Sequence, residues 1–407
     1  MTGNEQVVVT GLGVAAPTGL GVEQYWEATL KGISAVDRIS RFDPSGYPAQ
    51  LAGEIRGFVP EEHLPSRLIP QTDRMTQLAL VGADCAFADA QVQPKEVPEY
   101  EMGVVTASSS GGFEFGQHEL RNLWSQGPQY VSAYQSFAWF YAVNSGQISI
   151  RNGMRGPSGV VVSDQAGGLD ALAQGRRQIR KGTQLIVSGS VDASLCPWGW
   201  TAQLSSGRLS TATDPERAYL PFDPEARGHV PGEGGALLIL EDFARASSRG
   251  VRTPYCSIAG YGATLDPPAG TGRPANLPRA VEAALRDAGS APDEIDVVFA
   301  DAAALPELDR VESSTLAGLF GPRGVPVTAP KTATGRLYSG AGPLDVATAC
   351  LSVRDGVIPP TPGVRPAEEH DIDLVVDGPR EARVRQALVI ARGHGGFNSA
   401  LVVRAVD

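Results

Sequence analysis

Short runs of aliphatic and β-branched residues alternate with longer stretches of helical periodicity along the chain. Helices are predicted at 74–90 and 169–181, where apolar residues recur at helical spacing. Buried strands that alternate with helices are typical of an α/β architecture. The strands that the runs predict lie at 7–10, 104–106, 160–162, 185–187 and 237–240.

The second half of the chain starts the same pattern again. The strand-like segment at 256–262 echoes the sequence at 8–13, since both end in a Gly-X-Gly triplet. We therefore predict two similar halves, residues 1–250 and 251–407. The further elements predicted in the second half are a helix at 277–288, a strand at 297–299, an exposed Pro-rich connection at 359–366, and a closing hairpin of 388–390 with 400–403.

The most informative segment is the change from strand to helix at 159–170. The apolar run Val160-Val161-Val162 ends abruptly, a short polar turn follows, and a helix of small residues begins near Gln165. An α/β enzyme places a nucleophile at such a strand end, over the positively polarised N-terminus of the helix. The amide of Gln165 is neutral and non-basic, so it cannot be that nucleophile. The segment indicates a catalytic position from which the catalyst is missing.

Composition and charge exclude several classes of partner. The 407 residues are 42% hydrophobic and carry a formal net charge of −11, which is ordinary for a soluble globular protein and argues against nucleic-acid binding. We find no run of about 18 apolar residues and no basic segment followed by an apolar one at the N-terminus. We therefore expect no membrane span, no signal peptide and a cytoplasmic location. The four cysteines and five histidines are scattered, so we expect no metal and no cofactor.

Several motifs together resemble the ketosynthases of the thiolase superfamily. They are the opening strand and turn at 10–17, a loop at 221–235, a Lys-containing loop at 331–342 and a Gly-rich turn at 393–398. Their order and spacing match over nearly the whole chain, from about residue 7 to residue 403. The resemblance implies the thiolase fold, which has two similar α/β halves in a five-layered αβαβα arrangement.

The resemblance also shows what the chain lacks. In such ketosynthases a cysteine at the elbow carries the acyl chain, and two histidines support malonyl decarboxylation and stabilise developing charge. Matched position by position, Gln165 replaces the cysteine, Asp301 the first histidine and Arg336 the second. Only Lys331 is retained. An anionic Asp301 would oppose an enolate, and Arg336 cannot shuttle protons. We expect no catalytic residue here, and Asp301 could instead pair with Arg336.

Three further segments, at 136–144, 164–170 and 197–200, are similar to a chain length factor. This is the ketosynthase-β subunit of bacterial type II aromatic polyketide synthases, which serve antibiotic biosynthesis. The resemblance implies a heterodimer with a catalytic ketosynthase-α, whose cysteine holds a poly-β-ketone in a tunnel at the interface. It also implies an acyl carrier protein, bearing malonyl or polyketide chains, as the second partner.

One predicted helix face carries the candidate residues for setting chain length. Phe113, Gly116 and Leu120 stand at i, i+3 and i+7, so they share a face, and the matching positions of chain length factors line the tunnel. Because a small residue lengthens such a tunnel, Gly116 and Leu120 predict a product of roughly ten ketide units rather than about eight. A plain core face, with Gly116 serving close packing, is the alternative. Trp198 is a further tunnel candidate, or else an interface or core aromatic.

Two other functions stay open at this point. The chain could be a malonyl-carrier decarboxylase that primes the synthase through Gln165, as in loading domains that carry glutamine in place of the cysteine. Those domains keep both histidines, which this chain lacks. Alternatively, it could be a purely structural stabiliser of ketosynthase-α. His394, where the family often has an aromatic gate, is expected to be structural.

Overall fold

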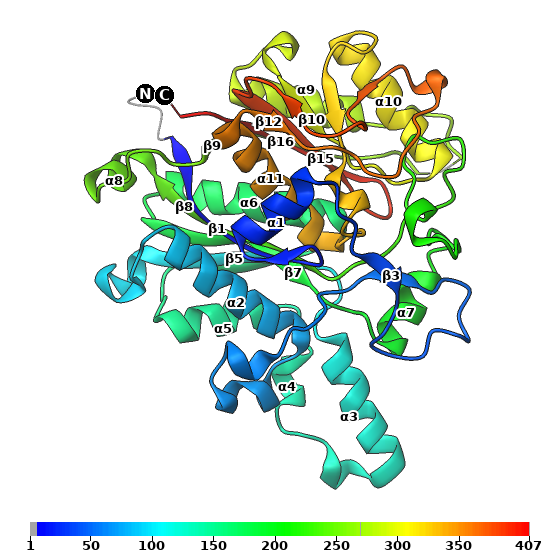
Figure 1. The fold of residues 1–407 in the computed structure, drawn as a ribbon. Helices are drawn as coiled ribbons and strands as arrows, with labels where there is room; N and C mark the ends of the chain where they lie inside the picture. The colour runs from blue at the N-terminus through cyan, green and yellow to red at the C-terminus, as the bar shows by residue number, and fades with distance from the viewer. Residues whose placement is uncertain (1–5, 269, 407) are drawn as a thin grey trace.

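The computed structural model describes residues 6–268 and 270–406, and the first five residues, where the absence of a signal peptide was predicted, lie outside that part. The strands of its first half form one part of a continuous sheet (Figure 1), and the short β2 (Gly19–Leu20) pairs with β1 at its border. From the middle of the molecule outwards β1 and β8 pair antiparallel, β8 and β7 antiparallel, and β5 and β6 follow in parallel. These strands are β1 (Val7–Ala16), β8 (Gly234–Asp242), β7 (Leu185–Asp192), β5 (Met102–Ser108) and β6 (Ser158–Val162).

The second half repeats that order and those directions. From the middle outwards β9, β16 and β15 pair antiparallel, and β10, β11 and β13 follow in parallel. The two halves join where β1 pairs with β9, at Val8 with Ser257 and Val9 with Cys256. The strands are β9 (Cys256–Leu265), β16 (Phe397–Arg404), β15 (Gln386–Arg392), β10 (Val297–Phe299), β11 (Pro326–Thr328) and β13 (Asp373–Leu374).

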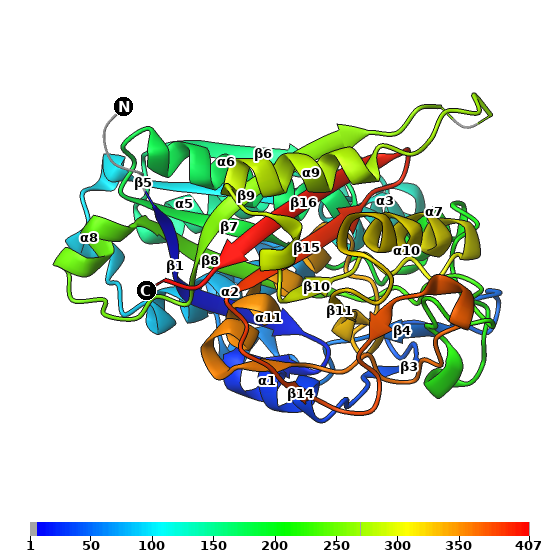
Figure 2. The same cartoon turned by 90° about the horizontal axis from the view of Figure 1, so that it is seen from above.

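Helices form the other three layers of the fold. The helices α2 and α5 pack on one face of the first half-sheet, α6 and α11 pack against each other between the half-sheets, and α9 lies along β9 and β16 with α10 beside it (Figures 1 and 2). The predicted thiolase fold of two similar halves is therefore confirmed. The helices are α2 (Arg74–Asp89), α5 (Val143–Asn152), α6 (Gln165–Arg180), α9 (Leu277–Ala288), α10 (Pro306–Phe320) and α11 (Ala341–Asp355).

The two central helices approach each other closely, and the sequence of α6 explains why they can. A Cβ on Gly168 would lie 2.2 Å from both the Ser339 carbonyl oxygen and Pro343 Cδ, so only glycine fits there. This contact fixes the start of α6 against the loop that precedes α11. It therefore brings the elbow at Gln165 next to the segment that carries Arg336.

One prediction about burial was wrong and a second was right only in part, since residues 363, 365 and 366 of the predicted exposed connection are exposed. The run at 160–162 forms β6 as predicted, but β6 is the outer strand of its half-sheet and is half-exposed, with Val162 53% exposed. The connection at 359–366 is buried over its first three residues, because the Thr361 N–H donates to the Val375 carbonyl and the Pro359 carbonyl accepts from Thr328 Oγ1. The boundary between residues 250 and 251 stays a prediction.

A helical protrusion extends from the first half, at the bottom of Figure 1. It consists of α3 (Phe113–Gln126), η5 (Pro128–Tyr130) and α4 (Gln135–Ala138), and α3 also contacts α7 (Pro197–Leu204). Elements outside the main layers include α1 (Val22–Leu30), α8 (Phe243–Ser248), the hairpin of β3 (Val36–Arg38) with β4 (Leu51–Gly53), and the pair β12 (Val357–Ile358) with β14 (Arg380–Glu381).

Candidate functional site

The elbow between β6 and α6 places Gln165 at the first position of the helix, as the sequence predicted. Its side chain is not displayed for chemistry, because only 2% of the residue is exposed. In the amide orientation that satisfies both neighbours, its oxygen accepts from Arg336 Nε at 2.7 Å and its nitrogen donates to the Tyr338 carbonyl at 3.0 Å. Gln165 therefore ties the elbow to the loop before α11.

Asp301 and Arg336 form a buried ion pair. Arg336 Nη2 lies 2.9 Å from both carboxylate oxygens of Asp301, and its Nη1 donates to the Asp301 carbonyl at 2.9 Å. Asp301 also accepts from the Arg392 N–H at 2.7 Å. Although burial alone would lower the pKa of Arg336, the Asp301 carboxylate raises it above its usual value. With Nε bound to Gln165, the Arg336 guanidinium is engaged on every side and fixed as a cation.

Lys331 is the one residue that this chain shares with the catalytic set of the family, and its side chain is also engaged in structural contacts. Its Nζ lies 2.6 Å from Asp345 Oδ2 and donates to the Ala300 carbonyl at 2.6 Å. Both side chains are about 5% exposed or less. Burial raises the pKa of Asp345 to about 6 even beside this lysine. Lys331 thus links α11 to the segment that carries Asp301.

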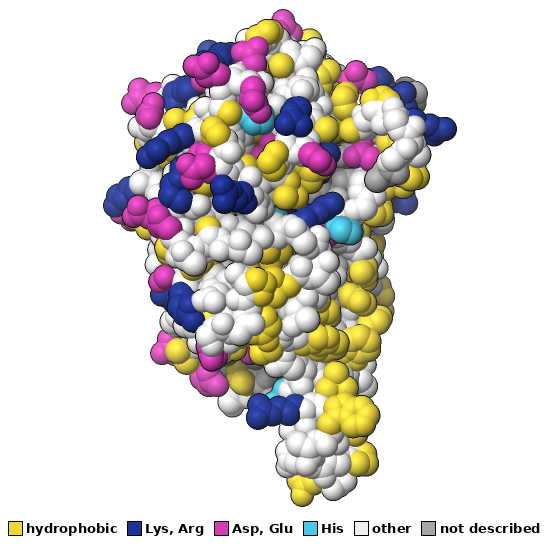
Figure 3. All heavy atoms as spheres, turned by 90° about the vertical axis from the view of Figure 1, so that its right-hand side faces the viewer, with side chains coloured by type: hydrophobic (Ala, Val, Ile, Leu, Met, Phe, Trp, Pro, Cys, Tyr) yellow, Lys and Arg dark blue, Asp and Glu magenta, His cyan; other side chains and the backbone are white. Residues whose placement is uncertain are grey.

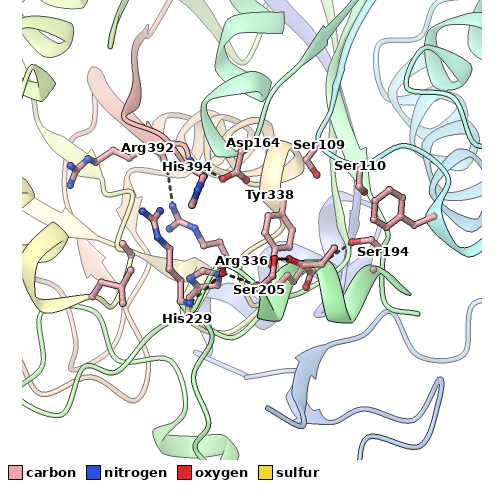
Figure 4. A pocket seen from close by; sticks show the side chains of 18 of the residues that line it. Ser109, Ser110, Asp164, Ser194, Ser205, His229, Arg336, Tyr338, Arg392 and His394 are labelled. Atoms are coloured by element: carbon pink, nitrogen blue, oxygen red, sulfur yellow. Dashed lines mark hydrogen bonds between the residues drawn. The ribbon is translucent and has the colours of Figure 1, made fainter. Parts of the chain in front are cut away.

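A cavity of about 440 Å³ remains beside this network (Figure 4). Its lining includes Asp164, Arg336, Tyr338, His229 and His394, and the Asp164 carboxylate accepts from the backbone N–H of His394. Within the described residues, Asp164 Oδ1, His229 Nε2 and the Tyr338 hydroxyl are buried without a hydrogen-bond partner. Burial lowers the pKa of His229 well below its usual value, so this imidazole is neutral. The cavity can hold a small molecule, but no thiol lines it.

Sequence reasoning missed three of these cavity residues. Asp164 lies in the segment at 164–170, Tyr338 in the loop at 331–342 and His229 in the loop at 221–235. Their positions gave a usable signal, since each lies inside a segment that resembles the family. Their unpaired atoms did not, because burial and pairing depend on the folded chain.

Of the four chain-length candidates, Phe113 lines the cavity, and Trp198 packs on both Phe113 and Gly116. Phe113 lines the cavity from α3, and its ring is stacked on Trp198 with centroids 4.7 Å apart and 7° between the planes. A Cβ on Gly116 would lie 3.1 Å from Trp198 Cζ3, so the indole covers this glycine. Leu120, one turn further along α3, is 37% exposed. Within α3 only Gly116 and Glu119 are buried, so most of the helix is not a core face, but the close packing of the indole on Gly116 is what the alternative expects.

Within residues 6–268 and 270–406, no group of three or more His, Cys, Asp or Glu side chains is placed to hold a metal ion. No helix in that part of the chain is long and apolar enough to cross a membrane.

Comparisons with known sequences cover the whole chain. The family profile of the beta-ketoacyl synthase N-terminal domain matches residues 4–246, and that of the C-terminal domain matches residues 255–365. The tetracenomycin polyketide synthase ketoacyl synthase beta subunit of Streptomyces glaucescens is 59% identical, with 99% of each chain covered. The actinorhodin polyketide beta-ketoacyl synthase 2 of Streptomyces coelicolor is 58% identical, with 98% of each chain covered.

Solved structures of similar fold come from the same kind of protein as these relatives. The ishigamide ketosynthase/chain length factor superposes with a TM-score of 0.90 at 26% identity over 100% of both chains. A type II ketosynthase solved with its acyl carrier protein and bound to a hexaketide gives a TM-score of 0.88 at 25% identity, over 99% of this chain and 100% of that one. The chain therefore belongs to the beta-ketoacyl synthase family, among the ketosynthase beta subunits of polyketide synthases.

Proposed function

We propose that this chain sets the length of a poly-β-ketone that a catalytic ketosynthase-α partner builds by decarboxylative condensation of malonyl units. The observation that carries the proposal is the closed network of Gln165, Arg336 and Asp301. These residues stand at the three catalytic positions and satisfy one another by hydrogen bonds and an ion pair. The chain then supplies neither the nucleophile nor the proton donors, and its contribution is steric.

We place the product in the longer class, roughly ten ketide units, from the size of the residues on α3. The structure changes the mechanism that the sequence indicated. The space above Gly116 is not an empty extension of the tunnel, because the Trp198 indole occupies it. Glycine lets the indole settle close to the α3 backbone. Any side chain at this position would push the ring outwards and shorten the space beside α3.

The test replaces Gly116 with leucine in the heterodimer and measures the mass of the polyketides formed. We expect shorter chains at a similar total yield. Gly318→Leu is the matched control: this glycine also lies in a helix, and nothing lies within 4 Å of the position of its Cβ. Unchanged product length in Gly116→Leu would favour the purely structural role.

An apolar face offers a docking surface for ketosynthase-α. Leu120, Trp139, Phe140 and Trp198 on α3, α7 and the segment after α4 are each 37–48% exposed, and hydrophobic side chains gather along this part of the molecule in Figure 3. The edge strand β6 leaves backbone groups without a neighbouring strand. Exposed apolar patches and open strand edges are both typical of protein interfaces.

The partnership is tested by co-purification with ketosynthase-α. Val162 on β6 is 53% exposed, so Val162→Glu places a charge at the open edge and should reduce the amount of partner recovered. Ile33→Glu is the control, because Ile33 is 51% exposed and lies after α1. Equal recovery with both variants would exclude this edge from the interface.

The proposal also concerns the acyl carrier protein and the location in the cell. A carrier protein binds the ketosynthase in one of the similar structures, and we propose that the carrier docks on the heterodimer that this chain completes. The cytoplasmic location stays a prediction. The decarboxylase alternative is disfavoured, because both ends of the Gln165 amide are already engaged.

A further inference from the structure

The helix α3 carries the chain-length residues, yet it lies outside the hydrophobic core. Its contacts are with η5, α4 and α7 rather than with the central sheet, and Figure 1 shows it extending from the body. Core packing therefore does not fix its position. Polar contacts at its N-terminal half hold it in place, together with the stack of Phe113 on Trp198.

The most deeply buried of these contacts is the Asp73 carboxylate, which is 2% exposed. Asp73 caps α2, because its Oδ1 accepts from the Met75 N–H at 2.8 Å. Its Oδ2 accepts from the Phe115 N–H in the first turn of α3, also at 2.8 Å. One carboxylate thus receives the N-termini of two helices, where backbone N–H groups carry partial positive charge.

The backbone before α3 lies directly against the same side chain. A Cβ on Gly112 would lie 2.9 Å from Asp73 Cβ, so glycine is needed for this approach. A second buried contact, from the Ser132 N–H to Glu119 Oε2, stays within the protrusion. Two further polar contacts join the described part of α3 to the body, and both are more open to water. Arg41 Nη2 lies 2.5 Å from Glu114 Oε1 with the glutamate side chain 40% exposed, and Gln117 Oε1 accepts from the N–H of the exposed Trp198.

We propose that Asp73 is a positioning residue for chain-length control. By joining the start of α3 to the core helix α2, it holds Phe113 and Gly116 in place against Trp198 and keeps the product to one length. Asp73 acts through α3 and touches no substrate. The inference rests on the proposed function, because it concerns the precision of the same length-setting surface.

The test is Asp73→Ser in the heterodimer, with product lengths measured by mass spectrometry. Serine still caps α2 but is too short to reach α3 as well, so it removes only the second contact. We expect a mixture of chain lengths with little loss of total polyketide. Asp242→Ser is the matched control, since Asp242 caps α8 through the N–H groups of Ala244 and Arg245 alone. The Asp242→Ser heterodimer should still make polyketides of a single length.

The readout separates positioning from a merely structural role. One unchanged length in Asp73→Ser, or loss of all product while the heterodimer persists, would overturn the proposal. If Asp73→Ser does not assemble, the isosteric Asp73→Asn replaces it, since one amide oxygen can serve only one of the two helices. If neither assembles, Asp73 is a folding residue and the proposal fails. A length shift in Gly116→Leu alone would defeat this inference and leave the proposed function standing.

Discussion

The indole of Trp198 lies parallel to the ring of Phe113, with 4.7 Å between the centroids and 7° between the planes. The two residues come from α7 and α3, which are separate in sequence and both contribute residues to the lining of the cavity. The same indole covers Gly116. The space beside α3 is therefore set by three residues together, and a change in one acts through the position of the indole.

We predict that Trp198→Ala yields longer chains or a mixture that contains them, because removal of the indole opens space beside α3. The double variant with Gly116→Leu should shorten the product less than Gly116→Leu alone. Residues that share one space give non-additive effects, and polyketide masses from the four proteins form the double-mutant cycle. Effects on length that simply add would show that Trp198 and Gly116 act at separate places.

The buried ion pair predicts a large effect on stability. Asp301→Ala leaves the Arg336 guanidinium, which is 5% exposed, without its carboxylate. Breaking a buried pair on one side destabilises a protein by about 3–5 kcal/mol. Denaturant unfolding of the purified protein measures this loss. The control is Asp37→Ala, whose partner Arg56 and own side chain are each about half exposed, and which should cost less than about 1 kcal/mol. Similar losses in both would contradict the structural role of the pair.

Local pattern was sufficient to predict most of the elements. The helix predicted at 277–288 and the strand predicted at 297–299 coincide with α9 and β10, because apolar residues recur at helical spacing in the first and form an unbroken run in the second. Burial was predicted less well. The exposure of β6 and the burial of Pro359 depend on which segments become neighbours in the folded chain, and no local pattern records that.

The candidate site, like the fold, was predicted from the sequence only in part. Motif matching placed Gln165, Asp301 and Arg336 at the catalytic positions, and the structure brings all three together. It could not predict that Arg336 binds both others at once, since that depends on the close contact of α6 with the loop before α11. The stacking of Trp198 on Phe113 could not be predicted from the sequence either, because it depends on how two helices are placed relative to each other.

Gln165→Ala should leave priming by the synthase intact. The Gln165 amide binds Arg336 and Tyr338, and the residue is only 2% exposed, so its second N–H is not accessible to a malonyl carboxylate or its enolate. Release of labelled carbon dioxide from malonyl carrier protein, with the heterodimer present, measures priming. Gln165→Cys is a second variant: it restores a thiol while positions 301 and 336 still lack a histidine, so it should add no condensation activity. A clear loss of priming in Gln165→Ala would revive the decarboxylase alternative.

The buried carboxyl of Asp73 predicts a pH dependence of stability. Burial raises the pKa of Asp73 from 3.8 to about 7, against the lowering effect of the Phe115 and Met75 N–H groups, while Glu114 raises it further and Arg41 lowers it. Between these two pKa values the folded protein holds a proton that the unfolded chain has released. The free energy of unfolding therefore falls as the pH rises from about 4 to about 7 and levels off above that.

Other buried acids titrate in the same window, since burial also raises the pKa of Asp309 to about 7 and of Asp345 to about 6. The measurement is therefore the difference between the parent protein and Asp73→Asn, which keeps those groups and lacks only the Asp73 proton. Relative to Asp73→Asn, the parent should lose stability from about pH 4 to about pH 7 in denaturant unfolding. Parallel curves over that range would show that Asp73 is ionised throughout. In that case the two helix N-termini would outweigh the effect of burial on this carboxylate.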